Sequence, residues 1–420
     1  MNKKSLWERC EISSNKDEDS FVGVRIKEND IHITFPMGYN LVESEDRVVR
    51  KEILSLLSIL KKFNKKKNSE ESFSMSQQAT LEFPIVSYQH LILDYFSNGY
   101  YSEKEVDYSS ANKGKINWKR TIQKKKPFLA DDNTVYLDFI VKKNIVNTNT
   151  ILSRIHEYCV YESFIKLGWL YTDMLPTEPR IKFNKKMFVA VLNEAIAQTF
   201  NDNKKQLFIA MRNVVNSANE GDTLSKECTY GTRSFEYVWE RMIDYVFGES
   251  NKEIYFPKAR WTLVGQTESV ESSSLQPDTI IRVDDKIYII DAKYYKYGIT
   301  GNPSNLPASS SIQKQITYGE YLTSGKFKEI YGQAFGQDKI FNAFVMPFNK
   351  DKKQDDEYKF VGIATADWKH SDKQYENVVG LLLDTKYLMD NCYVQNGMEI
   401  EKISTLIHNL FSEGGVYCEK

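Results

Sequence analysis

Two acidic side chains and one lysine have the types and the spacing to act together on one ion. Asp278 follows Pro277, and Asp291 is separated from Lys293 by Ala292 alone. Paired carboxylates can bind a divalent cation through oxygen, and an ammonium beside them can orient a water or help to deprotonate it. Joint action requires a fold that brings Asp278 next to Asp291.

The segment 276–295 has the pattern of a β-hairpin that meets this requirement. Its runs TIIRV and KIYIIDAKYY are rich in β-branched and aromatic residues, and they flank the turn-forming pair Asp284-Asp285. We expect Val283 and Lys286 to close a two-residue loop. A four-residue loop would give the same pairing register.

That register gathers charge at one end of one sheet face. It sets Asp278 directly opposite Asp291, where facing Cβ atoms lie about 5 Å apart, and Lys293 falls on the same face. Two close carboxylates cannot both stay ionised cheaply, and a divalent metal would remove the repulsion. As the alternative, Asp278 caps a strand and the other two are solvated edge residues. The apolar run IYII before Asp291 favours the first interpretation.

The combination of Pro277-Asp278 with Asp291-Ala292-Lys293 resembles the PD-(D/E)xK nuclease signature. The resemblance implies that the carboxylates of Asp278 and Asp291, with the carbonyl of Ala292, hold Mg²⁺, for which Mn²⁺ can substitute. It also implies that Lys293 orients the attacking water or assists its deprotonation.

Two further site residues are expected on helices that flank the hairpin. The stretch 231–248 has a helical apolar stripe, with Glu236 at its edge and Glu240 further round. Related nucleases often take an acid from such a helix, frequently in a Phe-Glu pair, so the resemblance favours Glu236 as a metal ligand. A surface ion pair is the alternative. Gln315 stands where relatives carry a Gln and Tyr helix, although its spacing to Tyr318 is one residue shorter than Q-x-x-x-Y.

The segment KGKINWKRTIQKKKP, residues 113–127, holds seven basic residues and no acid. Three interpretations stay open for it: an arm that contacts phosphates, a surface that docks an acidic protein, or a solvated turn region. The candidate binding residues are Lys113, Lys115, Trp118, Lys119, Arg120, Lys124, Lys125 and Lys126.

Composition limits the class of protein. The chain has 420 residues, 41% of them hydrophobic and 27% charged, with a formal net charge of −1. The chain as a whole is therefore not basic, and any surface that binds nucleic acid must be a local basic patch. The five cysteines are scattered without a CxxC spacing, which suits a reducing cytoplasm. The N-terminus lacks a signal-like apolar region and no long apolar run occurs, so we expect neither export nor a membrane span.

The element pattern predicts a mixed α+β or α/β protein of two domains. A β-rich N-terminal domain, 1–149, has a hairpin at 21–39 and helices at 45–62 and 85–97, and we expect it to dock a partner or DNA. The nuclease domain, 150–420, begins with helices at 150–168 and 185–218 and contains a restriction-endonuclease-like mixed sheet. Its further strands are predicted at 339–347, 358–364 and within VVGLLLD.

The order of the motifs narrows the resemblance. FVGVRI, FPMGY, GKINWKRTI, YGTRSFEYVWERMI, PDTII and IIDAKYY follow one another as in the LlaJI restriction endonucleases, which are related to the McrC nuclease subunit of McrBC systems. The resemblance implies a phage-defence restriction system, double-stranded DNA as substrate, a separate AAA+ GTPase and a cognate DNA methylase. The chain contains no G-x-x-x-x-G-K-[ST], so it is not the motor itself.

The expected function is therefore that of a Mg²⁺-dependent DNA endonuclease subunit. One alternative is an inactive nuclease fold that serves as a DNA-binding or scaffold subunit. Another is a nuclease for structured RNA or single strands.

Overall fold

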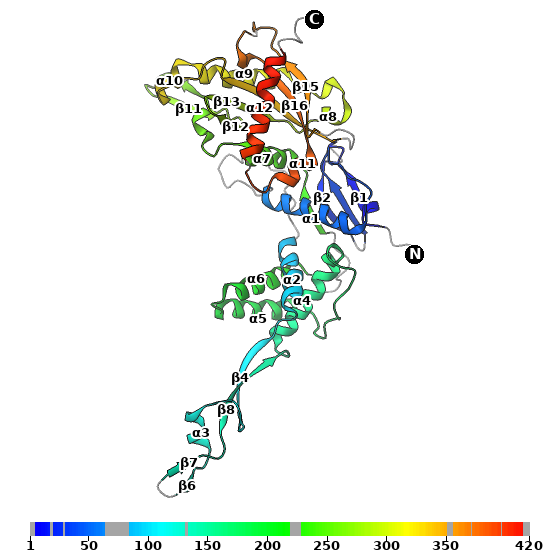
Figure 1. Cartoon of the computed structure of the whole chain (residues 1–420), viewed down its shortest axis with the longest axis vertical. Coiled ribbons are helices and arrows are strands. Elements are labelled where there is room, and N and C mark those ends of the chain that lie inside the picture. The colour runs from blue at the N-terminus through cyan, green and yellow to red at the C-terminus, as the bar shows by residue number, and fades with distance from the viewer. Residues whose placement is uncertain are drawn as a thin grey trace. The chain divides into compact units, whose positions relative to one another are not determined.

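The structure is a computed structural model that describes residues 5–16, 20–27, 30–63, 84–130, 133–218, 228–350, 356–370, 372–395 and 397–414. The chain forms two compact units (Figure 1). Unit 1 comprises Met1–Ile26, Asp30–Leu81 and Cys228–Lys420, and unit 2 comprises Lys27–Asn29 and Glu82–Glu227. Both ends of the chain thus belong to one unit, and the middle of the chain forms the other.

Unit 1 contains a small N-terminal sheet of four strands in the order β1-β3-β2-β9. Its strands are β1 (Cys10–Ile12), β2 (Val22–Lys27), β3 (Asp30–Phe35) and β9 (Cys228–Thr232). The neighbouring β2 and β3 confirm the predicted hairpin at 21–39. Helix α1 (Asp46–Phe63) confirms the helix expected at 45–62, and its buried stripe packs against α7 (Phe235–Phe247) and α11 (Thr385–Asn391). The charged stretch NKKKNSEES, residues 64–72, has the composition of a solvated loop and lies outside the described residues.

The core of unit 1 is a mixed five-stranded sheet in the order β12-β13-β14-β16-β15. Its strands are β12 (Thr279–Val283), β13 (Lys286–Ala292), β14 (Ile340–Phe348), β15 (Tyr358–Ala364) and β16 (Val378–Asp384). The central strands β13, β14 and β16 are parallel, and the edge strands β12 and β15 are antiparallel to their neighbours. Strands β14 and β16 are buried along their whole length, as their continuous apolar sequences indicate.

Helices cover both faces of this sheet. On one face, α9 (Ser309–Thr323) packs its Ile316, Tyr318 and Leu322 against Ile280 and Ile289. The other face carries α7 and α12 (Gly397–Gly414), whose contacts with β12 and β14 bury the alternate residues of the strands (Figure 1). The remaining helices are η1 (Trp7–Arg9), η4 (Lys252–Tyr255), α8 (Tyr297–Thr300), η5 (Pro303–Asn305), α10 (Gly325–Tyr331) and η6 (Gln374–Glu376).

An exposed two-stranded ribbon comes shortly before the core hairpin in the chain. It consists of β10 (Lys258–Thr262) and β11 (Ser269–Ser274), and every residue of β10 is exposed. The amide of Leu275 donates to the carbonyl of Pro257 over 2.9 Å and closes the base of the ribbon. This ribbon was not predicted.

Unit 2 is a helical bundle that carries an extended arm of strands (Figure 1). The bundle consists of α2 (Ile85–Asn98), α4 (Ile151–Leu167), η3 (Gly168–Leu170), α5 (Lys185–Gln198) and α6 (Asp202–Ser217), close to the predicted helices. The arm contains β4 (Glu103–Ser110), β5 (Lys115–Ile116), α3 (Trp118–Lys124), β6 (Phe128–Ala130), β7 (Asn133–Val135) and β8 (Ile140–Asn147). Strands β4 and β8 pair along eight residues and connect the bundle with α3.

The two units divide the chain differently from the predicted boundary near Asn149. Strand β2 pairs with β9, which follows the helical bundle in sequence, so the N-terminal strands fold with the C-terminal part. The alternating pattern predicts β2, but it predicts neither β9 nor a pairing that spans two hundred residues.

The described residues contain no helix that is long and apolar enough to cross a membrane. No disulfide joins the four described cysteines to one another.

Candidate functional site

The hairpin register places the predicted acid pair at the end of the core sheet. Val283 pairs with Lys286, and Thr279 pairs with Ile290, which confirms the predicted register. The loop residue Asp284 has a positive φ of 53°, a conformation that aspartate tolerates better than most side chains. Asp278 therefore lies immediately before β12 and opposite Asp291.

Backbone and side-chain contacts hold the acid pair at this end of the sheet. The Asp278 carboxylate accepts a hydrogen bond from the backbone N–H of Ala292 over 2.9 Å, and burial followed by the neighbouring Asp291 raises the pKa of Asp278. Asp291 is only 1% exposed, and its Oδ2 lies 2.8 Å from Nζ of Lys293. The two aspartates and the lysine thus form one cluster, as the alternating pattern predicted.

The cluster strongly perturbs the protonation of its members. Burial raises the pKa of Asp278, and the charge of Asp291, their mutual hydrogen bond and the charge of Glu240 raise it further. A carboxylate next to a second negative charge takes up a proton more readily, unless a cation offsets that charge. Burial lowers the pKa of Lys293, but Asp291 and Asp278 outweigh it, so the pKa of Lys293 lies above its ordinary value and the side chain is an ammonium.

Helix α9 adds uncharged polar groups to the same sheet face. Gln315 and Tyr318 are buried, and among the described residues neither amide atom of Gln315 nor the hydroxyl of Tyr318 has a hydrogen-bond partner. Burial, followed by the charges of Asp291 and Asp278, raises the pKa of Tyr318, which shows that its hydroxyl lies near the acid pair. Unsatisfied buried polar groups are rare in proteins, and groups beside a site are available to a ligand or water. Sequence analysis noted Tyr318 without assigning it a role.

Helix α7 brings Glu240 rather than Glu236 close to the acid pair. Burial raises the pKa of Glu240 to about 7, with opposing contributions from Lys293 and Asp291. Glu240 is also among the groups that raise the pKa of Asp278, whereas Glu236 is not among those acting on Asp278 or Lys293. The expectation from the resemblance pointed to Glu236. The helical wheel could not decide, because both acids lie outside the buried stripe.

The donor set of the acid pair fits a hard divalent cation. Among the described residues no group of three or more His, Cys, Asp or Glu side chains could hold a metal. A cation bound between Asp278 and Asp291 would therefore take its other ligands from backbone oxygens and water. Mg²⁺ is commonly held by one or two carboxylates and keeps several waters, which this arrangement would satisfy. The carboxylates are crowded without a cation, and this supports the fit.

The basic residues predicted as a binding arm lie in unit 2, in and around α3. Of the seven basic residues, six are exposed and Lys125 is half-buried, 3.9 Å from the carboxylate of Asp138. Arg120 lies over the ring of Tyr108 at 3.7 Å. Trp118 packs edge-on against Phe139 but is 54% exposed. The helix α3 replaces the irregular turn region that was one of the open interpretations.

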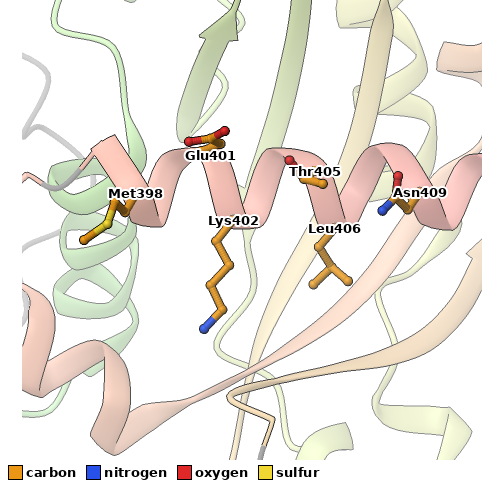
Figure 2. Close-up of a pocket in the computed structure, with 6 residues that line it drawn as sticks. All are labelled: Met398, Glu401, Lys402, Thr405, Leu406 and Asn409. Atoms are coloured by element: carbon orange, nitrogen blue, oxygen red, sulfur yellow. The ribbon is translucent and has the colours of Figure 1, made fainter.

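Two surface hollows of the described structure lie away from the acid pair. One, of about 440 Å³, runs along the outer side of α12 between Met398 and Asn409 (Figure 2). The other, of about 580 Å³, lies between the end of α7, Arg282 and Gln395. Neither contains a residue of the cluster, so the chemistry of the acid pair marks the site more reliably than the shape of the surface does.

Known proteins resemble this chain in sequence and in structure. The type II restriction enzyme BsuMI component YdjA of Bacillus subtilis (strain 168) is 27% identical over 270 residues. The alignment covers 59% of this chain and 55% of YdjA, so the chain spans about half the length of this relative. A half-complex from a tetradecameric assembly of Thermococcus gammatolerans McrB AAA+ hexamers with bound McrC matches 92% of this chain and 83% of that chain. Its TM-score of 0.37 and identity of 15% carry no weight here.

Family membership rests on a broader match. The profile of the LlaJI restriction endonucleases covers residues 21–385, which include the hairpin, α7, α9 and the basic arm. The resemblance seen in the order of the motifs is therefore confirmed, and the chain belongs to the LlaJI restriction endonuclease family.

Proposed function

We propose that this chain is the nuclease subunit of a restriction system and hydrolyses phosphodiester bonds of double-stranded DNA with Mg²⁺. The observation that carries the proposal is the cluster of Asp278, Asp291 and Lys293 at one end of a sheet, in a chain of a restriction endonuclease family. Structural ion pairs seldom place two carboxylates next to each other when one of them, here Asp291, is buried. A site for a divalent cation and a phosphate explains why the fold keeps them there.

The charge of each residue determines the role that we assign to it. Asp278 and Asp291 would hold Mg²⁺, with the carbonyl of Ala292 as a further oxygen ligand. The ion, when bound, supplies charge stabilisation at the scissile phosphate and a water of lowered pKa. Because Lys293 is an ammonium in this environment, we assign it to orienting that water and offsetting phosphate charge, and not to accepting the proton.

Two helices would complete the site. Glu240 of α7, with its pKa raised to about 7, has the protonation range of a group that can accept or pass a proton near neutral pH. We therefore assign the additional acid to Glu240 in preference to Glu236. The unpartnered Gln315 amide and Tyr318 hydroxyl of α9 would hold a water or a phosphate oxygen.

The proposed partners follow from what the chain contains and lacks. It has no phosphate-binding loop of the Walker type, so a nucleotide-driven motor must be a separate protein, which the family resemblance identifies as an AAA+ GTPase. The predicted docking domain, 1–149, includes the exposed basic arm, which we propose as the surface for that partner or for DNA. A DNA methylase would protect host DNA, and the system would act in the cytoplasm.

The arm also favours a second candidate function. Exposed aromatic and basic side chains around α3 would suit a DNA-binding or scaffold subunit even if the acid pair were inactive. Metal-dependent cleavage would exclude this alternative.

One assay tests the proposal. The full chain is incubated with plasmid DNA in Mg²⁺ or EDTA, with and without the AAA+ protein and GTP, and with single-stranded DNA and structured RNA as competing substrates. We expect cleavage of the duplex that requires Mg²⁺. No cleavage under any combination would favour the scaffold, and preference for RNA or single strands would change the substrate class.

A further inference from the structure

Lys252 holds the backbone of Asp278 from outside the core sheet. Its Nζ donates a hydrogen bond to the carbonyl oxygen of Asp278 over 2.5 Å and forms an ion pair of 2.6 Å with Oδ1 of Asp244. The Lys252 side chain is only 23% exposed. A lysine that contributes only surface charge would extend into water, whereas this one spans from η4 to the first residue of the proposed site.

The position of β12 explains why such a contact is needed. β12 is an edge strand, so its outward-facing backbone groups have no neighbouring strand. Outward carbonyls recur every second residue, and here they belong to Ile280 and Asp278. The first accepts from the amide of Glu249 over 2.8 Å and the second accepts from Lys252. The segment after α7 thus takes the place of a missing strand.

The second partner of Lys252, Asp244, lies near the end of α7. The amide of Gly248 donates to the carbonyl of Asp244 over 2.8 Å and ends the helix. A Cβ at Gly248 would lie 2.4 Å from both that carbonyl and Oδ1 of Asp244. Only glycine lets the Asp244 carboxylate lie close enough to the chain to anchor Lys252.

We propose that Lys252, anchored by Asp244, is a positioning residue that fixes Asp278 for metal binding. Asp278 precedes β12 and lacks the ladder bonds that hold a residue inside the strand. Its side chain is held by the amide of Ala292 and its main chain by Lys252, so the two contacts together set the direction of the carboxylate. This inference rests on the proposed nuclease function.

The test compares Lys252→Met with wild type in the full chain. Mn²⁺ affinity is measured by calorimetry, and DNA cleavage is measured in single turnovers at saturating Mn²⁺. Groups that orient metal ligands typically contribute roughly 10- to 100-fold, so we expect Mn²⁺ affinity to fall by that factor. Lys252→Arg keeps donors for both oxygens and should restore most of the affinity. Lys326→Met removes an exposed ion pair with Glu329 and serves as the matched control, with wild-type affinity.

A merely structural role would lower the melting temperature and leave Mn²⁺ affinity unchanged below it, and that result would overturn the proposal. If Lys252→Met does not fold, Asp244→Asn decides, because the amide weakens the anchor without deleting it. Wild-type affinity in Asp244→Asn would also overturn the proposal. Asp278→Ala distinguishes a failure of the nuclease function from a failure of the positioning role. If Asp278→Ala binds Mn²⁺ and cleaves DNA normally, the proposed function fails. If Asp278→Ala is inactive and Lys252→Met is normal, only the positioning role is overturned.

Discussion

The carboxylates of Asp278 and Asp291 lie close together, and burial followed by the charge of Asp291 raises the pKa of Asp278. Opposing residues of an antiparallel pair are near enough for the contact, and burial of Asp291 removes the water that would screen it. The fold therefore carries an electrostatic penalty that a bound cation would relieve.

The penalty predicts a pH dependence of stability in metal-free protein. The pKa values of Asp278 and Glu240 are raised, so the folded state binds their protons more tightly than the unfolded state does. Their contribution to stability is present below the ordinary values of 3.8 and 4.5, and it is lost as the pH rises through about 7, the pKa of Glu240. In EDTA, the melting temperature should drop between pH 5 and pH 8 in both proteins. The drop in Asp278→Asn should be smaller than the drop in wild type by roughly 2 °C or more.

Calorimetry at both pH values, with and without Mg²⁺, checks this expectation. Mg²⁺ should raise the melting temperature of wild type at pH 8 and have little effect on Asp278→Asn, since a bound ligand stabilises only the state that binds it. An equal loss in both proteins would show that the acid pair is not crowded.

Glu240 and Glu236 give a second prediction because they differ in their surroundings while sharing one helix. Glu240→Gln should lower cleavage by about 10- to 100-fold, since it removes a carboxylate that acts on Asp278. Glu236→Gln is the matched control on the same helix and should remain within a few-fold of wild type. The reverse order of effects in a single-turnover assay would restore Glu236 as the site acid.

The acid pair could be predicted from sequence, whereas Lys252 could not. Asp278, Asp291 and Lys293 follow from strand periodicity and a short loop, which are local rules. Lys252 is 26 residues from Asp278 and carries no motif. Its role depends on where α7 ends and on β12 being an edge strand, and both are properties of the assembled sheet.

Among the elements, α9 determines how the uncharged polar groups face the acid pair. Its Gly319 lies against Tyr375 of η6, and a Cβ there would be 2.4 Å from the Cβ of Tyr375. The helix can therefore lie this close to η6 only because position 319 has no side chain. The burial of Gln315 and Tyr318 depends on this close approach.

Gly319→Ala should consequently destabilise the protein and reduce cleavage. Alanine favours a helix over glycine by about 1 kcal/mol, but overpacking of a core costs about 1–3 kcal/mol, and a 2.4 Å contact lies far inside van der Waals range. We expect a lower midpoint in urea together with slower cleavage. Gly325→Ala in α10, where nothing lies within 4 Å, is the control and should be neutral or slightly stabilising. A stabilised and fully active Gly319→Ala would contradict this packing.

Most elements of unit 1 could be predicted, because their apolar residues recur at the spacing of strands or helices. The hairpin, α1, α7 and the buried strands β14 and β16 lie where the pattern placed them. The short helix α3 was not predicted, since its residues Trp118–Lys124 are nearly all polar or exposed and show no apolar stripe. Asn117 begins that helix by accepting a hydrogen bond from the amide of Arg120 over 3.1 Å, a signal that could have indicated it.

At the scale of the whole molecule, the proposed chemistry and the basic arm belong to different units. The segment that carries the arm is inserted between β3 and β9 of unit 1, so it can change without altering the core sheet. Neither the position of this insertion nor the pairing of β2 with β9 follows from local sequence. The division suggests that recognition and cleavage can be separated by mutation.

The arm prediction uses simultaneous replacement of Lys119, Arg120, Lys124, Lys125 and Lys126 by alanine. If the arm binds DNA, affinity should fall and the slope of log K against log salt should flatten by roughly 0.9 for each lost phosphate contact. If it docks the motor, DNA binding by this chain alone should not change and stimulation of the partner's GTP hydrolysis should drop.

The control replaces the exposed Lys182, Lys186 and Lys205 of the same unit by alanine, and neither quantity should change. If DNA affinity and GTP hydrolysis are both unchanged in the arm variant, the basic segment binds neither DNA nor the partner and is a solvated surface.

The most direct measurement of the central claim is Mg²⁺-dependent DNA cleavage by Asp278→Ala, Asp291→Ala and Lys293→Ala beside wild type, with circular dichroism to verify folding. Each variant removes one part of a single assembly of metal and water, so each should abolish cleavage. A double variant should cleave no more slowly than either single variant. Asp278→Ala and Asp291→Ala should fold, because the residues lie at a strand end and loss of one carboxylate relieves repulsion. Lys293→Ala removes the charge that offsets Asp291, so its circular dichroism is the critical folding check. A folded Asp291→Ala protein that cleaves DNA at the wild-type rate in Mg²⁺ would contradict the account.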